Sequence, residues 1–185
     1  MNYLIVGLGN IGAEYHNTRH NYGFMVLDAW AQASNIIFNS ERYGSIGTTK
    51  FKGRTLTLLK PSTYMNLSGK AVHYWMQKLK IPKENVMILV DDMALPLGSM
   101  RIRKKGSDGG HNGLANIAEI LGTIDYPRLR LGISEKVGNQ VDYVLGKWTP
   151  DEMKVVNETI VKVIDACKAF TTIGIDRTMN TYNTK

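Results

Sequence analysis

Short apolar runs alternate along this chain with segments of helical periodicity. The runs at residues 3–6 and 86–90 are continuous and apolar, which is typical of buried strands, and the second is expected to stop at Asp91 and Asp92. Residues 24–34 instead place apolar side chains three and four positions apart, which predicts an amphipathic helix. Further elements are expected as helices at about 70–79 and 114–121, and as strands at 99–103 and 128–133. This alternation indicates the α/β fold class.

Two features refine this architecture. Segments 45–51 and 55–59, joined through Gly53, look like a hairpin, so the sheet should be mixed. Thr149, Pro150 and Glu152 supply an N-cap, a first-turn proline and a capping-box partner for a helix expected at about 150–172. Because no internal repeat or low-complexity linker divides the 185 residues, they predict a single globular domain over residues 1–185.

Charge and composition narrow the function classes. The chain has 23 Lys and Arg against 16 Asp and Glu, a net charge of +7, which favours a polyanionic partner, although a simple solubility bias explains it equally well. The single cysteine, Cys167, excludes an intramolecular disulfide and a cysteine-based zinc site. The absence of an export signal or a long apolar stretch predicts a cytoplasmic protein that does not enter membranes.

The sequence GLGNIG at residues 7–12 matches the G-x-G-x-x-G fingerprint of dinucleotide-binding proteins. That fingerprint binds pyrophosphate only when its third glycine lies in a helix whose N-terminus faces the ligand. Here eleven loop-like residues separate Gly12 from the apolar helix pattern that begins at Phe24. A nicotinamide or flavin cofactor is therefore disfavoured, and an oxidoreductase remains an alternative that cofactor titration would detect.

Metal and serine chemistry also lack support. His16 and His20 lie four residues apart, a spacing that binds zinc on a helix, but no helical pattern surrounds them and Arg19 would repel a cation. Neither a G-x-S-x-G elbow nor a Walker loop occurs. We therefore expect no metal and no cofactor.

Three polar loops, at residues 10–20, 61–66 and 109–112, each follow or precede a core element, and Asp91 ends a predicted strand. In open α/β sheets such loops converge at the carboxyl ends of the strands. A histidine there can take a proton from water, a carboxylate can fix its tautomer, and asparagine amides can donate to an oxyanion. The set suits attack of water on an acyl carbon, although each asparagine or aspartate taken alone is more often a turn former.

Four strings carry a resemblance to a known family: VGLGNIGAEYHNTRHNYGF, KPSTYMNLSG, LVDDMALPLG and GSDGGHNGL, in this order. Together they resemble the bacterial-type peptidyl-tRNA hydrolases, from Leu4 to about Trp148. The resemblance implies one domain with a mixed, twisted sheet flanked by helices. It also implies a monomeric, cofactor-free enzyme that hydrolyses the ester between a peptide and the 3′-terminal ribose of tRNA, and so recycles tRNA in translation.

The same resemblance assigns roles to individual residues. His20 is similar to the family's general base and Asp91 to the carboxylate that keeps it basic. Asn10 matches the residue that helps to separate N-blocked peptidyl esters from free aminoacyl esters. Positions that match contacts to the tRNA end or the peptide are Tyr15, Tyr64, Met65, Asn66, His111 and Asn112. Arg103 and Arg130 fall where the family clamps the 5′-phosphate, whereas Ala115 replaces a usual lysine or arginine.

A second function class stays open at this point. A catalytically silent RNA-binding domain would present the same basic residues, because phosphate attraction by the Arg101–Lys105 cluster does not depend on nucleotide sequence. Deacylation of an N-acetylated aminoacyl-tRNA separates the two classes.

Overall fold

A computed structural model describes residues 1–134 and 140–184 of the chain. Its centre is one seven-stranded sheet in the order β2-β3-β4-β1-β5-β7-β6. The strands are β1 (Asn2–Gly7), β2 (Asn39–Glu41), β3 (Gly44–Phe51), β4 (Arg54–Pro61), β5 (Val86–Pro96), β6 (Met100–Arg103) and β7 (Arg128–Ser134). The inner strands β4, β1, β5 and β7 pair in parallel, and the flanking strands pair antiparallel. The predicted mixed sheet is therefore confirmed.

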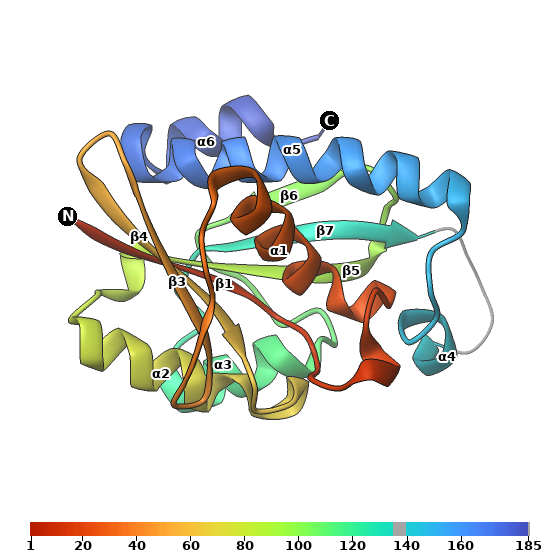
Figure 1. Ribbon diagram of the computed structural model, residues 1–185, viewed down its shortest axis with the longest axis horizontal. Coiled ribbons are helices and arrows are strands. Elements are labelled where there is room, and N and C mark those ends of the chain that lie inside the picture. The colour runs from red at the N-terminus through yellow and green to blue at the C-terminus, as the bar shows by residue number, and fades with distance from the viewer. Residues whose placement is uncertain (135–139, 185) are drawn as a thin grey trace.

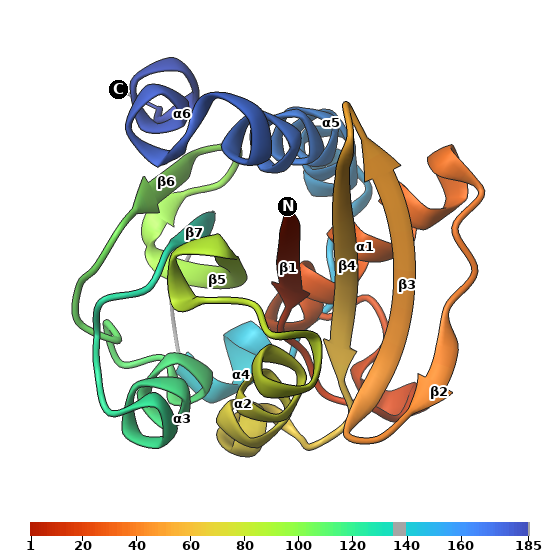
Figure 2. The same cartoon turned by 90° about the vertical axis from the view of Figure 1, so that its left-hand side faces the viewer.

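Helices cover both faces of this sheet (Figures 1 and 2). The helices are α1 (Tyr22–Ser34), α2 (Ser68–Leu79), α3 (Asn112–Leu121), α4 (Gln140–Val144), α5 (Pro150–Ile173) and α6 (Ile175–Tyr182). Helices α1, α5 and α6 lie on one face, and α2 and α3 lie on the other. Alternate side chains of β1 enter the two cores, Ile5 beneath α1 and α5 and Leu4 beneath α2 and α3.

Most elements expected from the hydrophobic pattern are present, including the hairpin of β3 and β4. The capping box at the start of α5 forms as expected, with the Thr149 side chain accepting from the Glu152 backbone and the Glu152 side chain accepting from the Thr149 backbone. Three elements were not expected: the three-residue strand β2, the short helix α4 and the helix α6.

The expected end of the fifth strand at the acidic pair is wrong. Strand β5 continues to Pro96, because Asp91 and Asp92 keep their backbone pairing with Leu131 and Gly132 of β7. Charge does not end a strand when its side chains find polar partners beyond the apolar core, and Asp91 has such partners. The register shifts only between Asp92 and Pro96.

Two glycines that flank the first loop, Gly7 and Gly23, allow close approach of two backbone segments. A Cβ on Gly7 would lie 2.3 Å from the carbonyl oxygen of Gly23, so these two glycines let α1 pack directly against the end of β1. Between them, residues 13–15 and 19–21 form separate 3-10 turns, and α1 starts only at Tyr22. The third glycine of the fingerprint, Gly12, thus precedes no long helix, as the sequence indicated.

The carboxyl ends of β1, β4, β5 and β7 share one edge of the sheet, and the polar loops extend from this edge. Among the helices of the described chain, none combines the length and apolar character needed to span a bilayer.

Candidate active site

A pocket of about 410 Å³ opens at the carboxyl edge of the sheet, beside the end of β5. It has a polar side, formed from the β5 strand end, the turn before α1 and the start of α3, and an apolar side formed partly by α4. Its lining residues are His20, Asp91, Asp92, Met93, Ala94, Gly109, Gly110, His111, Asn112, Arg130, Val141 and Val144. Segments far apart in the sequence thus meet at one concave surface.

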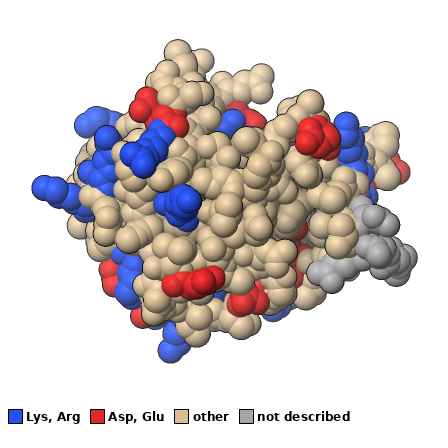
Figure 3. Space-filling model, turned by 90° about the horizontal axis from the view of Figure 1, so that it is seen from below, with Lys and Arg blue, Asp and Glu red and all other residues tan. Residues whose placement is uncertain are grey.

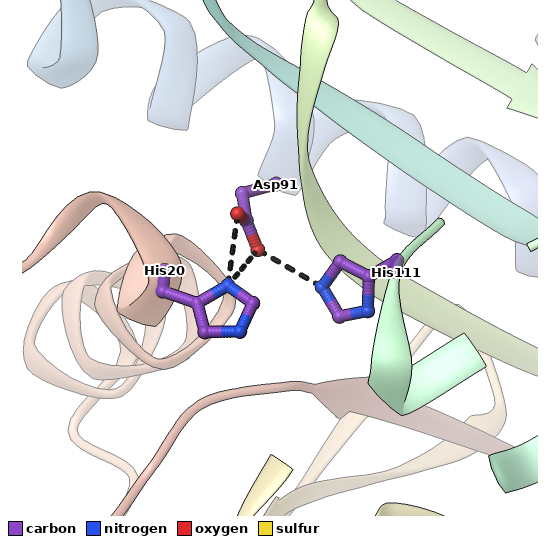
Figure 4. A group of neighbouring side chains, drawn as sticks. All are labelled: His20, Asp91 and His111. Carbon is purple, nitrogen blue, oxygen red and sulfur yellow. Dashed lines mark hydrogen bonds and ion pairs between the residues drawn. The ribbon is translucent and has the colours of Figure 1, made fainter. Parts of the chain in front are cut away.

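Asp91 lies between two imidazole rings (Figure 4). The Nδ1 atom of His20 is 2.9 Å from both carboxylate oxygens, and Nε2 of His111 is 3.0 Å from Oδ1. The two ring centroids are 5.0 Å apart. The predicted proximity of His20 and Asp91, 71 positions apart in the chain, is confirmed, and the contact of His111 with the same carboxylate was not predicted.

Backbone hydrogen bonds fix the tautomer of His111. This residue is the N-cap of α3, and its Nδ1 accepts from the backbone N–H groups of Gly113 and Leu114 at 3.1 and 3.4 Å. Because Nδ1 accepts, the ring proton must lie on Nε2, from which His111 donates to Asp91. Histidine here replaces the Ser, Thr, Asp or Asn usual at an N-cap.

The carboxylate of Asp91 in turn fixes His20. As an ionised carboxylate it only accepts, so Nδ1 of His20 must carry a proton and Nε2 keeps a lone pair. Within residues 1–134 and 140–184, no group hydrogen-bonds to that Nε2, and Figure 4 shows it on the side of the ring away from Asp91. Burial lowers the pKa of His20, but the charge of Asp91 and its hydrogen bond raise it by more, so the net shift is upward. The result is a histidine suited to accept a proton.

Asp91 itself is held ionised. Burial raises the pKa of this carboxyl, but attraction to the two rings and the hydrogen bonds from them outweigh that effect, and the pKa is lowered far below its ordinary value. Its side chain is only 4% exposed, so the carboxylate depends on these two donors for its stabilisation.

The three side chains also resemble a metal-binding group, since their ligand atoms lie within 4.8 Å of one another. A divalent ion would need a lone pair on each ring nitrogen that faces the carboxylate. His111 cannot offer one, because its Nδ1 already accepts from the backbone of α3 and its proton is on Nε2. This donor set fits hydrogen bonding and does not fit metal coordination.

Asn10 connects two of the polar loops. Its Oδ1 accepts from the backbone N–H of Met65 at 2.6 Å, and its backbone exchanges two hydrogen bonds with the side chain of Asn21. With Oδ1 occupied, the amide Nδ2 is left as the donor that Asn10 can offer a ligand. Neighbouring Tyr64 has φ of +59° and ψ of 156°, a conformation that a bulky residue rarely adopts and that aligns the loop with this contact.

The structure brings five of the predicted residues around the pocket: His20, Asp91, His111, Asn112 and Arg130. The other predicted residues do not line it. They are Asn10, Tyr15, Tyr64, Met65, Asn66 and Arg103. Met65 is buried in the core beneath α2 and α3, whereas Tyr64 and Asn66 are exposed on the loop before α2.

Sequence reasoning missed two groups at the pocket. Val141 and Val144 contribute an apolar wall from α4, an element too short to show a periodic signal. Asp92 Oδ2 lies 3.6 Å from Arg130 Nη1 of the neighbouring strand β7, and the two side chains are 14% and 13% exposed. The one sequence signal for Asp92 is its position next to Asp91. The two carboxylates have different partners, since Asp91 binds two histidines and Asp92 faces Arg130.

Comparisons with known proteins agree over the whole chain. The sequence description of the peptidyl-tRNA hydrolase family matches residues 4–185. The peptidyl-tRNA hydrolase of Phocaeicola vulgatus is 59% identical over 187 aligned residues and that of Clostridium botulinum 45% over 182, with at least 96% of each chain covered. The crystal structure of the Acinetobacter baumannii peptidyl-tRNA hydrolase superposes with a TM-score of 0.90 at 32% identity, covering 98% of this chain and 95% of that one.

Proposed function

The chain belongs to the peptidyl-tRNA hydrolase family, and from this premise we propose that its pocket hydrolyses the ester between a peptide and the 3′-terminal ribose of tRNA. The observation that supports this most directly is the hydrogen-bonded series His111–Asp91–His20, which leaves one basic nitrogen directed away from the carboxylate. The products are a free peptide and a tRNA available again for translation.

In the proposed mechanism His20 is the general base. Its Nε2 takes a proton from water as the water oxygen bonds to the ester carbon, and Asp91 stabilises the resulting imidazolium through Nδ1–H. Collapse of the tetrahedral intermediate breaks the bond to the ribose oxygen, which receives the proton from His20. An ester is more reactive than an amide, so one base with neutral amide donors is sufficient.

Two asparagines are suited to bind the acyl group. Asn112 lines the pocket at the first turn of α3, where its amide and the positive end of the helix favour a developing oxyanion. Asn10 presents an amide N–H₂ because its Oδ1 is already bonded to Met65. That amide can donate to a peptide carbonyl and repels a free α-ammonium, which would separate peptidyl-tRNA from aminoacyl-tRNA.

The RNA is proposed to bind through its acceptor end and 5′-phosphate. Arg130 is in the pocket, where its guanidinium donates to the carbonyl of Ser107 at 2.5 Å and faces Asp92. Arg103 lies on the edge strand β6 with its side chain exposed. On the face of α2 and α3, Lys and Arg are more frequent toward the end far from the pocket (Figure 3), where they would meet the body of a bound RNA. Tyr15, Tyr64 and Asn66 on the adjoining loops would contact the single-stranded 3′ end.

We further propose that the enzyme acts as a cytoplasmic monomer without a cofactor. Strands β5 and β7, the turn before α1, α3 and α4 of one chain together line the pocket, which supports action as a monomer.

Replacement of His20 tests this function. His20→Ala should lower the rate of deacylation of N-acetylated aminoacyl-tRNA by about 10²–10⁴-fold and leave the affinity for uncharged tRNA nearly unchanged. His73→Ala, on the half-buried side of α2, is the matched control and should keep the normal rate. A wild-type protein that binds tRNA without releasing the acetylated amino acid would be a silent RNA-binding domain, and a fully active His20→Ala variant would refute the mechanism.

A further inference from the structure

Arg19, which precedes the candidate base, contacts two separate parts of the chain. It lies with His20 in the 3-10 turn of residues 19–21 and is buried, with 9% of its surface exposed. A buried arginine needs partners for its guanidinium, and the partners it has come from α4 and from the first turn of α5. Its position next to His20 makes those partners relevant to the reaction.

The first partner is the segment that forms the apolar wall of the pocket. Arg19 Nη1 donates to the carbonyl of Tyr143 at 3.2 Å, and its backbone N–H donates to the carbonyl of Gly146 at 3.0 Å. The guanidinium lies over the Tyr143 ring at 4.3 Å and the Trp148 ring at 5.6 Å. Thr18 and Lys147 add an antiparallel bridge. The wall residues Val141 and Val144 are on this same segment.

The second partner is Glu152. Its Oε1 accepts from Arg19 Nη2 at 2.9 Å and from the backbone N–H of Thr149 at 2.8 Å, so one oxygen completes both the capping box of α5 and the ion pair. The two charged side chains are 10% and 11% exposed. A pair so protected from water is screened little by salt and holds its geometry.

These contacts fix the base relative to the wall. His20 is bound on one side to Asp91 of β5, and Arg19 binds the opposite flank of the same turn to α4 and α5. Tyr143 is attached in addition to the sheet, because its hydroxyl donates to the carbonyl of Ile133. The turn with His20 therefore cannot shift toward or away from Val141 and Val144 while the guanidinium keeps its partners.

We propose that Arg19 is a positioning residue that sets the distance between the His20 base and the apolar wall against which the acyl group lies. The proposal rests on the proposed function, since it requires an acyl ester in the pocket. Arg19 does not touch the reacting atoms. A small displacement of a base from its target costs much of its contribution, by up to about 10²-fold for a shift near 1 Å.

The test uses Arg19→Met, Arg19→Lys and Thr149→Ala. Arg19→Met removes the side-chain contacts with both Tyr143 and Glu152. Arg19→Lys keeps a positive charge that reaches Glu152 but loses the planar guanidinium and its stacking on the aromatic rings. Thr149→Ala weakens the capping box at the side chain that accepts from Glu152 and leaves the Arg19 pair intact, so it controls for loss of α5 stability.

In single-turnover deacylation of N-acetylated aminoacyl-tRNA, we expect Arg19→Met to lower the rate by about 10- to 100-fold, Arg19→Lys by less, and Thr149→Ala hardly at all. Affinity for uncharged tRNA should change by less than about threefold in all three variants, because Arg130 is untouched. If Arg19→Met does not fold, Arg19→Lys alone carries the test. An unchanged rate, or the same loss in Thr149→Ala, would overturn the proposal.

Hydrogen exchange keeps this result separate from a failure of the proposed function. Arg19→Met should speed amide exchange in residues 15–21 and 140–148 together, whereas Thr149→Ala should affect only the start of α5. Faster exchange in Arg19→Met than in wild type, together with a wild-type protein that has no deacylase activity, would show that Arg19 holds the two segments while the proposed function is wrong. Unchanged exchange in both segments would refute the positioning role itself.

Discussion

Replacing Asp91 with asparagine should reverse the tautomer of His20. The amide would offer one acceptor and one donor to two rings that now both donate to the carboxylate. His111 must keep its proton on Nε2, because its Nδ1 accepts from Gly113 and Leu114. The amide oxygen would therefore face His111, and the amide N–H₂ would face Nδ1 of His20. Nδ1 would then accept, and the proton would move to Nε2, where a base needs a lone pair.

The size of the loss follows from the cost of restoring the active tautomer. With Nδ1 protonated, the ring N–H and the amide N–H would face each other in a buried site, leaving two donors unsatisfied at about 1–3 kcal/mol each. The sum, about 2–6 kcal/mol, corresponds to roughly 30- to 3 × 10⁴-fold in rate. The same exchange in Ser-His-Asp triads costs about 10⁴-fold. We expect Asp91→Asn to lower the deacylation rate by about 10³-fold.

Kinetics and ring-nitrogen NMR together check this reasoning. Single-turnover rates give the loss, and ¹⁵N shifts of His20 report which nitrogen carries the proton; the chain has only 4 histidines, which simplifies assignment. The control is a double-mutant cycle that combines Asp91→Asn with His111→Asn. The His111→Asn change keeps a good N-cap for α3 but removes the ring that orients the amide of Asp91→Asn. In the His111→Asn background, Asp91→Asn should lower the deacylation rate by a smaller factor than it does in the wild-type protein. A His20 ring that keeps its proton on Nδ1 in Asp91→Asn would refute the tautomer argument.

The remaining predictions concern pH and RNA affinity. Because the pKa of His20 is raised above its ordinary value of 6.5, and because the base must be unprotonated, the acid limb of the kcat/KM profile should lie above pH 6.5; a limb below that value would contradict the ion pair with Asp91. Arg130→Ala should raise KM more than it lowers kcat and flatten the salt dependence of tRNA binding by about one unit of slope. Asp92→Asn should do the reverse, lowering KM by about two- to tenfold, because Asp92 now competes with phosphate for Arg130; an unchanged KM in Asp92→Asn would show that this carboxylate does not oppose RNA binding.

The hydrophobic pattern predicted the long elements and missed those that depend on tertiary contacts. Helix α5 is encoded locally by its capping box and apolar face, so its start was predictable. Helix α6 has no capping box, and its apolar face consists of only Ile175, Met179 and Tyr182. The end of the chain is held through the Asn183 side chain, which donates to and accepts from the backbone of Ile102 on edge strand β6. Strand β2 has three exposed residues and pairs only with β3. A strand of three exposed residues is too short to show a hydrophobic period.

The candidate site was predictable as a set of residues but not as a network. The positions of polar loops beside core elements indicated that His20, Asp91 and the asparagines would gather at one edge. Loop sequences do not show which side chain caps a helix, so the contacts of the His111 ring with Asp91 and with the start of α3 were not predicted. The contacts of Arg19 were not predicted for a related reason, since its side-chain partners lie more than 120 positions away.

The two rings that contact Asp91 come from opposite layers of the fold. His20 lies in the turn that leads into α1, on one face of the sheet, and His111 caps α3, on the other face. Strand β5 runs between these layers and carries Asp91 where its apolar pattern ends. The tautomer of the base therefore depends on the helix cap of the opposite layer, through the carboxylate that the two rings share. A substitution that loosens the start of α3 should thus act on the chemistry through Asp91, without altering either candidate catalytic side chain.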